Sequence, residues 1–330
     1  MKKLLPILFV LIITSCSKEI PLHQLVERNG VSYQVNQENP FTGLTLSYHP
    51  NGQLESRVKY KNGLKDGLTE TFNQNGQILE SINFKENIEN GPFEVFHENG
   101  QLQIEGINNN GLPSDGQLEG FYENGSLESR MNFKDGQLDG PFESYHENGN
   151  KSEVKYFKNN KLDGPYKSYW TNGNLKKESD YEDDKESFEI KTYYESGELQ
   201  NHNYLEGVKE VHKRYHKNGP LLSIQYKVNG VKEGPDVTYY ENGIVKYWTN
   251  YKGGEIIGNN GSFFSNGEPS VIYGDLDGDR HGWSYFGSED GGVTKFCYEY
   301  DDMVLNRTVC DGLSINQFIE KFKVLVSNNQ

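Results

Sequence analysis

Aromatic residues recur along the chain about every 24 positions, and each is followed by a short polar stretch that ends in Gly. We number each repeat from the Gly of its Asn-Gly pair (Ser-Gly in one repeat) as position 0. The ten glycines are 22 to 25 residues apart: Gly52, Gly76, Gly100, Gly125, Gly149, Gly173, Gly197, Gly219, Gly243 and Gly267. Position −4 is aromatic in all ten repeats: Tyr48, Phe72, Phe96, Phe121, Tyr145, Tyr169, Tyr193, Tyr215, Tyr239 and Phe263. A fixed period of this length indicates a repeat architecture.

The Asn-Gly pairs predict β-hairpins with a three-residue loop. Asn-Gly can close either a two-residue loop or a type I turn followed by a left-handed Gly. Pro50 occupies the second position of such a type I turn, where its fixed φ is favourable. The three-residue loop also pairs the ring at −4 with position +2, which is mostly apolar, as in Tyr48 and Leu54. The two-residue loop would pair the rings with mostly polar residues, so we predict the longer loop and a buried face that carries the rings.

A second turn closes each repeat, as in "FKDGQLDGP". Because one hairpin is not stable alone, each repeat must pack against its neighbours. We therefore predict an all-β fold: an elongated antiparallel β-hairpin repeat array of about eleven units over residues 39–291. Pairs such as Phe142 and Tyr145 are three positions apart and cannot share one face of a regular strand, which suggests a bulge or coil between them.

Residues 292–330 are predicted to form a C-terminal cap with a short helix over 314–326. Ser314 and Gln317 form a capping box, and Ile315, Phe318 and Phe322 share one helical face. The expected role of this helix is to close the last hairpin. The alternative is a helix that binds a partner.

The N-terminus has the pattern of an export signal. Lys2 and Lys3 precede an apolar run that is too short to span a bilayer, and residues 1–15 are predicted to be a lipoprotein signal peptide. The segment "ITSCSKE" resembles a bacterial lipobox, which implies cleavage before Cys16 and a lipid on its thiol. Residues 16–38 would then be a tether and first cap. The expected location is the bacterial cell envelope, lipid-anchored to the outer membrane; the alternative is an ordinary signal peptide with an incidental Cys.

The cysteine count allows one disulfide, and the net charge limits the classes of partner that the protein can bind. With Cys16 assigned to lipid, Cys297 and Cys310 are a candidate disulfide in an oxidising compartment, and two unpaired buried thiols are the alternative. Without Lys2 and Lys3, 31 basic residues face 48 acidic ones, a net charge of −17. Such a chain repels nucleic acid, so no nucleic-acid partner is expected.

No motif for catalysis, a metal or a cofactor stands out. The chain has no G-x-S-x-G, P-loop, CxxC or HExxH motif. His49, His97, His146 and His216 all occupy position −3, so the closest two are two repeats, or about 20 Å, apart and cannot share one ion. The run Asp275, Asp277, Asp279 lacks the Gly and Glu of a calcium loop, and we interpret it as a solvated turn. We therefore expect no enzyme activity, no metal and no cofactor.

The residues at −3 are the candidate binding site. They face opposite the ring column and have Ser or Thr beside them at −5, which suggests a solvated face. From the fourth repeat onward this column forms the predicted partner-binding stripe: Tyr122, His146, Trp170, Tyr194, His216, Tyr240 and Phe264. Exposed rings at repeat spacing suit a peptide, a glycan or a protein edge. The alternative is that these rings merely cover their neighbours.

Segments such as "GPFEVFHENGQL" and "GPYKSYWTNGNL" resemble the variant MORN repeat, in the form found in proteins labelled YwqK-family antitoxins of toxin–antitoxin systems. The resemblance implies an elongated antiparallel β-array that acts as an interaction surface and has no catalytic residues. An antitoxin normally meets its toxin in the cytoplasm, whereas Cys16 points to the envelope. We therefore predict a non-catalytic, lipid-anchored repeat scaffold of the envelope that binds a protein, peptide or glycan. The alternative is an antitoxin-like or immunity protein that neutralises a specific toxin.

Overall fold

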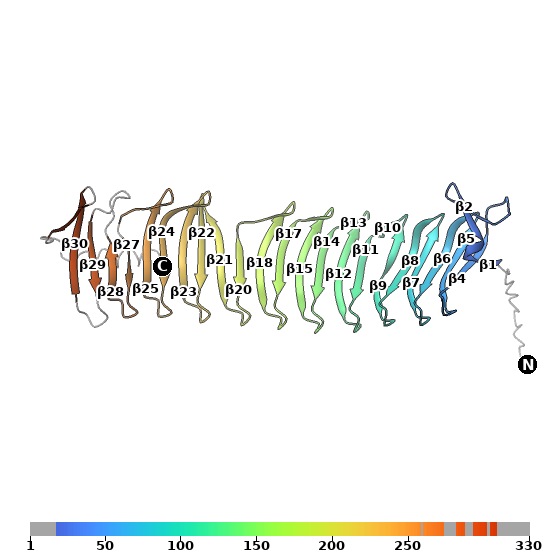
Figure 1. Ribbon diagram of the computed structural model, residues 1–330, viewed down its shortest axis with the longest axis horizontal. Helices are drawn as coiled ribbons and strands as arrows, with labels where there is room; N and C mark the ends of the chain where they lie inside the picture. Colours follow the sequence, from blue (N-terminus) through green and yellow to red (C-terminus); the bar gives the residue numbers. More distant parts are fainter. Residues whose placement is uncertain (1–17, 259, 274–281, 288–292, 302–303, 309–330) are drawn as a thin grey trace, which may run out of the picture. The chain divides into compact units, whose positions relative to one another are not determined.

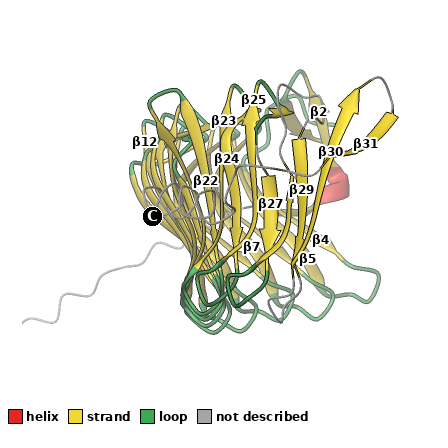
Figure 2. Cartoon of the chain, turned by 90° about the vertical axis from the view of Figure 1, so that its left-hand side faces the viewer, coloured by secondary structure: helices red, strands yellow, loops and turns green. Residues whose placement is uncertain are grey.

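Short strands joined by tight turns make up nearly all of the structure (Figures 1 and 2). The computed structural model describes residues 18–258, 260–273, 282–287, 293–301 and 304–308. One 3-10 turn, η1 (Leu22–Gln24), is the only helical element among them. The chain divides into two compact units, residues 1–164 and 165–330. The prediction of an all-β hairpin array is confirmed in each unit, whereas the helix predicted over 314–326 lies outside the described residues.

The N-terminal unit is one antiparallel sheet in which successive strands pair with each other, with a small hairpin formed by β2 and β3 beside it. Its strands are β1 (Glu19–Pro21), β2 (Leu25–Arg28), β3 (Val31–Gln34), β4 (Gly43–Tyr48), β5 (Leu54–Lys61), β6 (Leu64–Phe72), β7 (Ile78–Lys85), β8 (Ile88–Phe96), β9 (Leu102–Asn109), β10 (Leu112–Pro113), β11 (Gly116–Phe121), β12 (Leu127–Lys134), β13 (Gln137–Leu138), β14 (Gly140–Tyr145), β15 (Lys151–Lys158) and β16 (Lys161–Leu162). Strand β1 differs from the others because it pairs in parallel with β4, with Ile20 beside Thr45. Within the segment 16–38, predicted to be a tether and first cap, β1 belongs to the main sheet, and β2 and β3 form the small separate hairpin.

The C-terminal unit repeats the same scheme. Its strands are β17 (Gly164–Tyr169), which begins at the last residue of the first unit, β18 (Leu175–Glu182), β19 (Lys185–Glu186), β20 (Ile190–Tyr193), β21 (Leu199–Glu206), β22 (Lys209–Tyr215), β23 (Leu221–Val228), β24 (Val231–Tyr239), β25 (Val245–Lys252), β26 (Glu255–Ile256), β27 (Asn260–Phe263), β28 (Pro269–Tyr273), β29 (Gly282–Gly287), β30 (Val293–Asp301) and β31 (Val304–Thr308). Neighbouring strands from β20 to β25 pair antiparallel in sequence order. Each repeat therefore contributes one hairpin.

The predicted three-residue loop is confirmed. In the first repeat His49 N–H donates to Gln53 O at 2.8 Å, and Gly52 N–H donates back to His49 O at 2.9 Å. Gly52 has φ +86°, the left-handed conformation that this loop requires at its last residue. Tyr48 pairs with Leu54, as the longer loop predicts, and the same pairing of −4 with +2 recurs at Tyr239 and Val245.

The sheet does not have one buried and one solvated face, as the sequence predicted. We call face A the face that carries the rings at −4, and face B the opposite face, which carries the side chains at −3. Face A was predicted to be the buried one, but Tyr239 is only 3% exposed while Tyr48 is 55% exposed, and most of the other rings are half-buried. Tyr145 Oη donates to Glu143 on the same face at 2.6 Å, and Lys151 contacts that carboxylate too. Face A is therefore charged in this part of the first unit, because position −6 carries Glu in four successive repeats: Glu70, Glu94, Glu119 and Glu143.

Face B carries apolar side chains in the same region. Phe142 contacts Phe157 edge-on, with ring centroids 6.0 Å apart, and the ammonium of Lys155 lies 4.6 Å from the Phe142 centroid. Phe142 pairs with Lys155 and Glu143 with Val154 in a regular ladder, so Phe142 and Tyr145 lie on opposite faces. The bulge falls between Ser144 and Tyr145 and shifts the register next to the loop. The three-residue spacing therefore marks two faces rather than one irregular face.

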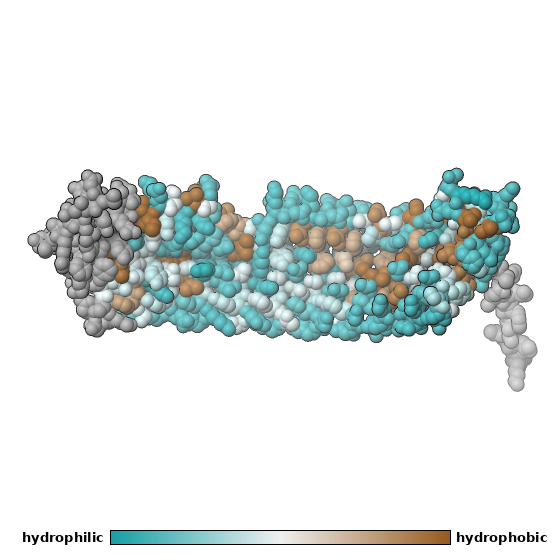
Figure 3. Space-filling model, in the orientation of Figure 1, coloured by the Kyte–Doolittle hydropathy of each residue, from teal (hydrophilic) through white to brown (hydrophobic). Residues whose placement is uncertain are grey.

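Each unit also has a small buried core. In the first unit Ile20, Phe41, Val58 and Tyr60 cluster where β1 covers β4, and the Phe41 and Tyr60 rings meet edge-on at 6.0 Å. In the second unit the core consists of Val211, Ile224, Val237 and Tyr239 on β22, β23 and β24. Outside these two clusters few of the described side chains are fully buried, so contacts between neighbouring strands supply much of the stability. Figure 3 shows the resulting surface, on which apolar patches interrupt a largely hydrophilic face.

Candidate functional site

The predicted stripe at −3 is used for contacts between repeats. Most of its side chains donate a hydrogen bond to the backbone carbonyl at −4 of the following repeat. The bonds run from Tyr122 to Tyr145 (2.6 Å), from Trp170 to Tyr193 (3.2 Å), from Tyr194 to Tyr215 (2.9 Å), from His216 to Tyr239 (3.1 Å) and from Tyr240 to Phe263 (2.9 Å). His49 and His97 make the same bond in earlier repeats, each at 2.8 Å. All seven stripe residues, His146 and Phe264 included, are half-buried rather than fully exposed.

These hydrogen bonds between repeats explain which residue types occupy position −3. Tyr, His and Trp share a ring that carries an N–H or O–H donor far from the backbone, and the donor must reach the next hairpin. At Tyr122, burial together with Glu128 and Glu147 raises the pKa of the phenol, so the hydroxyl keeps the proton that it donates. The stripe therefore positions neighbouring repeats and also forms part of the surface of face B.

The Asn at −1 supplies a second ladder that the sequence analysis missed. Asn242 Nδ2 donates to Ser265 O of the next repeat at 2.8 Å, and its Oδ1 accepts from Ile244 N–H at 3.1 Å. Asn51, Asn99 and Asn172 make the same inter-repeat bond at 2.8 Å. None of these residues has a positive φ, so Asn is not required there by the turn conformation. Its recurrence in nine of the ten repeats is explained by these side-chain bonds.

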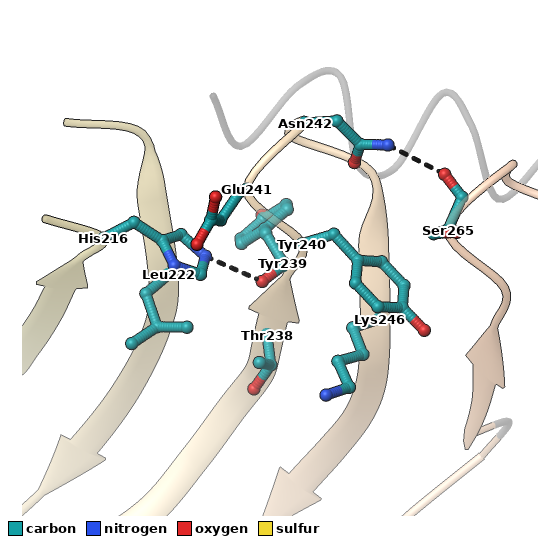
Figure 4. A pocket seen from close by; sticks show the side chains of 9 residues that line it. All are labelled: His216, Leu222, Thr238, Tyr239, Tyr240, Glu241, Asn242, Lys246 and Ser265. Atoms are coloured by element: carbon teal, nitrogen blue, oxygen red, sulfur yellow. Dashed lines mark hydrogen bonds between the residues drawn. The ribbon is translucent and has the colours of Figure 1, made fainter. Parts of the chain in front are cut away.

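A groove lies on face B of the C-terminal unit, between two of these loops (Figure 4). Its volume is about 500 Å³, within the usual range for ligand sites. The lining residues come from β23 to β25 and the loops that follow β22, β24 and β27: His216, Leu222, Thr238, Tyr239, Tyr240, Glu241, Asn242, Lys246 and Ser265. His216 and Tyr240 are predicted stripe residues, so the structure brings two of the seven together in one concave site.

Lys246, which lines this groove, lies beside two aromatic rings. The ammonium of Lys246 lies 5.4 Å from the ring centroid of Tyr240 and 5.5 Å from that of Tyr247. Tyr247 pairs with Thr238 on the neighbouring strand and is 53% exposed, which places an open ring beside the groove. The sequence analysis did not single out Lys246 or Tyr247, which occupy positions +3 and +4 of their repeat.

The structure describes little of the other predicted sites. Cys16, Cys310 and the Asp275–Asp279 segment lie outside the described residues, and nothing is described of the Cys297 side chain. Within the described ranges, no three His, Cys, Asp or Glu side chains are grouped so that they could hold a metal ion. A helix with the length and apolarity needed to cross a membrane is likewise not found in the described part of the chain.

Six segments match the family model of the MORN repeat variant. They are residues 41–62, 65–86, 89–107, 114–135, 138–159 and 162–183. Most of these MORN-variant segments fall in the N-terminal unit, and each holds most or all of both strands of one hairpin together with the Asn-Gly loop that joins them. The matched segments agree with the resemblance drawn from "GPFEVFHENGQL" and its copies.

No curated protein matches the chain. Among solved structures, the crystal structure of TcdB2-TccC3 is 9% identical, with 83% of this chain and 19% of that chain covered and a TM-score of 0.16. The structure of TcdB2-TccC3 without its hypervariable C-terminal region is 11% identical, with 78% and 15% covered and the same TM-score. The chain thus spans less than a fifth of the length of these proteins, and scores this low support no argument about function.

Proposed function

We propose that this protein is a non-catalytic repeat scaffold that binds a partner on face B of its C-terminal unit, and that it is held at the bacterial envelope by a lipid on Cys16. The observation that carries the proposal is the groove of about 500 Å³ at His216 and Tyr240, flanked by the exposed ring of Tyr247. Half-buried rings around a concave site offer contact area at a low cost in side-chain entropy. The regular hairpins hold that site on rigid strands.

The first test asks whether a partner contacts this groove in the cell. A photo-reactive benzoylphenylalanine in place of Tyr247 is expected to cross-link one or a few defined proteins, because this position is open and borders the groove. The matched control places the same group at Val208, which is 78% exposed but lies in the turn between β21 and β22. Adducts are measured by immunoblot and identified by mass spectrometry.

Two outcomes of this test decide the proposal. Equal adduct patterns from both positions, or no adduct from position 247, would show that the groove is not a partner site. A toxin among the proteins captured specifically at position 247 would make neutralisation of that toxin the function of the scaffold, which is the antitoxin-like alternative.

The second test concerns the anchor. Cys16→Ser is expected to move the protein from the detergent phase to the aqueous phase in a phase-partition experiment, because the replaced thiol is the proposed lipid attachment point. Cys297→Ser serves as the control and is expected to stay in the detergent phase. Retention of Cys16→Ser in the detergent phase would contradict lipid anchoring at this residue.

A further inference from the structure

The groove contains a lysine without a carboxylate partner among the described residues. Lys246 contacts the rings of Tyr240 and Tyr247 and makes no ion pair within the described part of the chain. Lys232 on the neighbouring strand is paired with Asp236 at 2.7 Å.

Among the described residues that line the groove, one is acidic, and its carboxylate is bonded to the preceding loop. Glu241 Oε2 accepts a hydrogen bond from Asn218 Nδ2 of the preceding loop at 3.3 Å. Figure 4 shows Glu241 on the His216 side of the groove and Lys246 below Tyr240. The positive charge of Lys246 therefore remains available for an anionic group.

Most hydrogen-bond donors around the groove are already used. His216 Nε2 is bonded to Tyr239 O, Tyr240 Oη to Phe263 O and Asn242 Nδ2 to Ser265 O. A sugar chain would need many directed donors and acceptors, because its hydroxyl groups lose water on binding. What the groove offers instead is apolar area and one ammonium group.

That apolar area is close to the charge. Leu222 on β23 lines the groove beside His216, and the rings of Tyr240 and Tyr247 lie around the Lys246 ammonium. A ligand that fills this site should therefore present an apolar side chain next to an anion. The site lies on the face of the sheet, so a ligand can bind there without pairing its main chain with an edge strand.

We infer that the groove binds an extended peptide segment in which an apolar side chain stands beside a carboxylate. The carboxylate pairs with Lys246 Nζ, and the apolar side chain packs between Leu222 and the rings of Tyr240 and Tyr247. This inference rests on the proposed function, since it names the chemistry of the partner at the same site. An acidic glycan is the competing ligand, and the test includes it.

The test uses purified full-length protein in detergent and a synthetic array of octapeptides. One set carries Asp or Glu between apolar residues, and the matched set carries Asn or Gln at the same places. Binding of the best acidic peptides is then measured by fluorescence anisotropy, and it is expected to be at least about tenfold tighter than that of their amide counterparts, because a charge-assisted hydrogen bond is worth more than a neutral one. An oligogalacturonate is the glycan probe.

Lys246→Gln is the decisive variant, and Lys252→Gln, an exposed lysine at the other end of β25, is its control. Lys246→Gln is expected to remove the preference for acidic peptides, and Lys252→Gln to keep it. Equal binding of acidic and amide peptides overturns the inference, as does an acidic preference that survives Lys246→Gln. Binding of oligogalacturonate that depends on Lys246, without peptide binding, also overturns it.

The two proposals can fail separately. If no array peptide binds while position 247 still cross-links a cellular protein, the peptide inference is wrong and the scaffold function stands. If position 247 cross-links no protein, the scaffold function itself is wrong at this site.

Discussion

Replacement of Ile224 by Ala is expected to lower the free energy of unfolding of the C-terminal unit by about 2 to 4 kcal/mol. Ile224 is 2% exposed and packs with Val211 and Val237 in the small core of this unit. Truncation removes buried methyl groups and leaves a cavity that the flanking strands cannot fill without breaking their pairing. Few other side chains of the described part of this unit are as deeply buried, so little else can compensate.

Hydrogen exchange is the suitable measurement, because repeat arrays open locally rather than all at once. Amides of β23 and β24 should exchange faster in Ile224→Ala, by the factor that corresponds to the lost stability. Val208→Ala is the control: this side chain is 78% exposed, and its truncation should change stability by less than about 0.5 kcal/mol. Similar exchange in both variants would show that this cluster is not a stabilising core.

Gly43→Ala is expected to detach β1 from β4 at the start of the N-terminal unit. Leu44 N–H donates to Lys18 O at 2.8 Å, and a Cβ on Gly43 would overlap that same carbonyl oxygen. The added methyl group would also lie 2.7 Å from Cζ of Phe41, which belongs to the buried cluster there. Because two of its neighbours are backbone and core atoms, we expect a local loss of about 3 kcal/mol and the loss of protection at the Leu44 amide.

Gly116→Ala is the control that distinguishes the effect of this steric clash from that of backbone strain. Gly116 opens β11 with φ +127°, and no atom lies within 4 Å of the position that its Cβ would take. Its substitution should therefore cost only the strain of an L-residue in that conformation, about 1 to 2 kcal/mol. The amide of Leu44 should keep its protection in this variant. A protected Leu44 amide in Gly43→Ala as well would contradict the close approach of β1 to Gly43.

The turn and the register could be predicted from the sequence because they depend on neighbouring residues. Pro50 in the loop and Leu54 opposite Tyr48 together distinguish the three-residue loop from the two-residue one. These constraints act within one hairpin, and the repeat pattern supplied ten independent copies of them. The all-β array followed from the same pattern.

The division of the faces was predicted less well. A ring at −4 beside Leu at +2 suggested an apolar face A, but the Glu at −6 makes an ion pair in three repeats of the first unit, as Glu143 does with Lys151. The apolar contacts on face B come from rings at −7, such as Phe142, whose role became clear only when both strands were placed. Position −4 alone does not determine which face is buried.

The groove could be predicted only in part. Two residues of the predicted stripe, His216 and Tyr240, line the groove, but their bonds to the next repeat depend on the distance between hairpins, which no single repeat encodes. Lys246 becomes significant because Glu241, the acidic residue that lines the groove, is bonded to Asn218 instead, and sequence spacing does not show this. The same reason hid the role of Asn242 as a bridge between loops.

Strand β1 begins at Glu19, three residues after the proposed lipid attachment at Cys16. Three residues extend at most about 10 Å, roughly the depth of a headgroup layer. A lipid on Cys16 would thus leave only a short stalk, and the pairing of β1 with β4, with Ile20 in the buried cluster, would hold the first hairpin close to the bilayer. Detachment of β1 would free only the residues up to Pro21, because the β2–β3 hairpin keeps its own bond from Ser32 N–H to Gly63 O. A change at one glycine would still alter how far from the lipid surface this end of the protein can move.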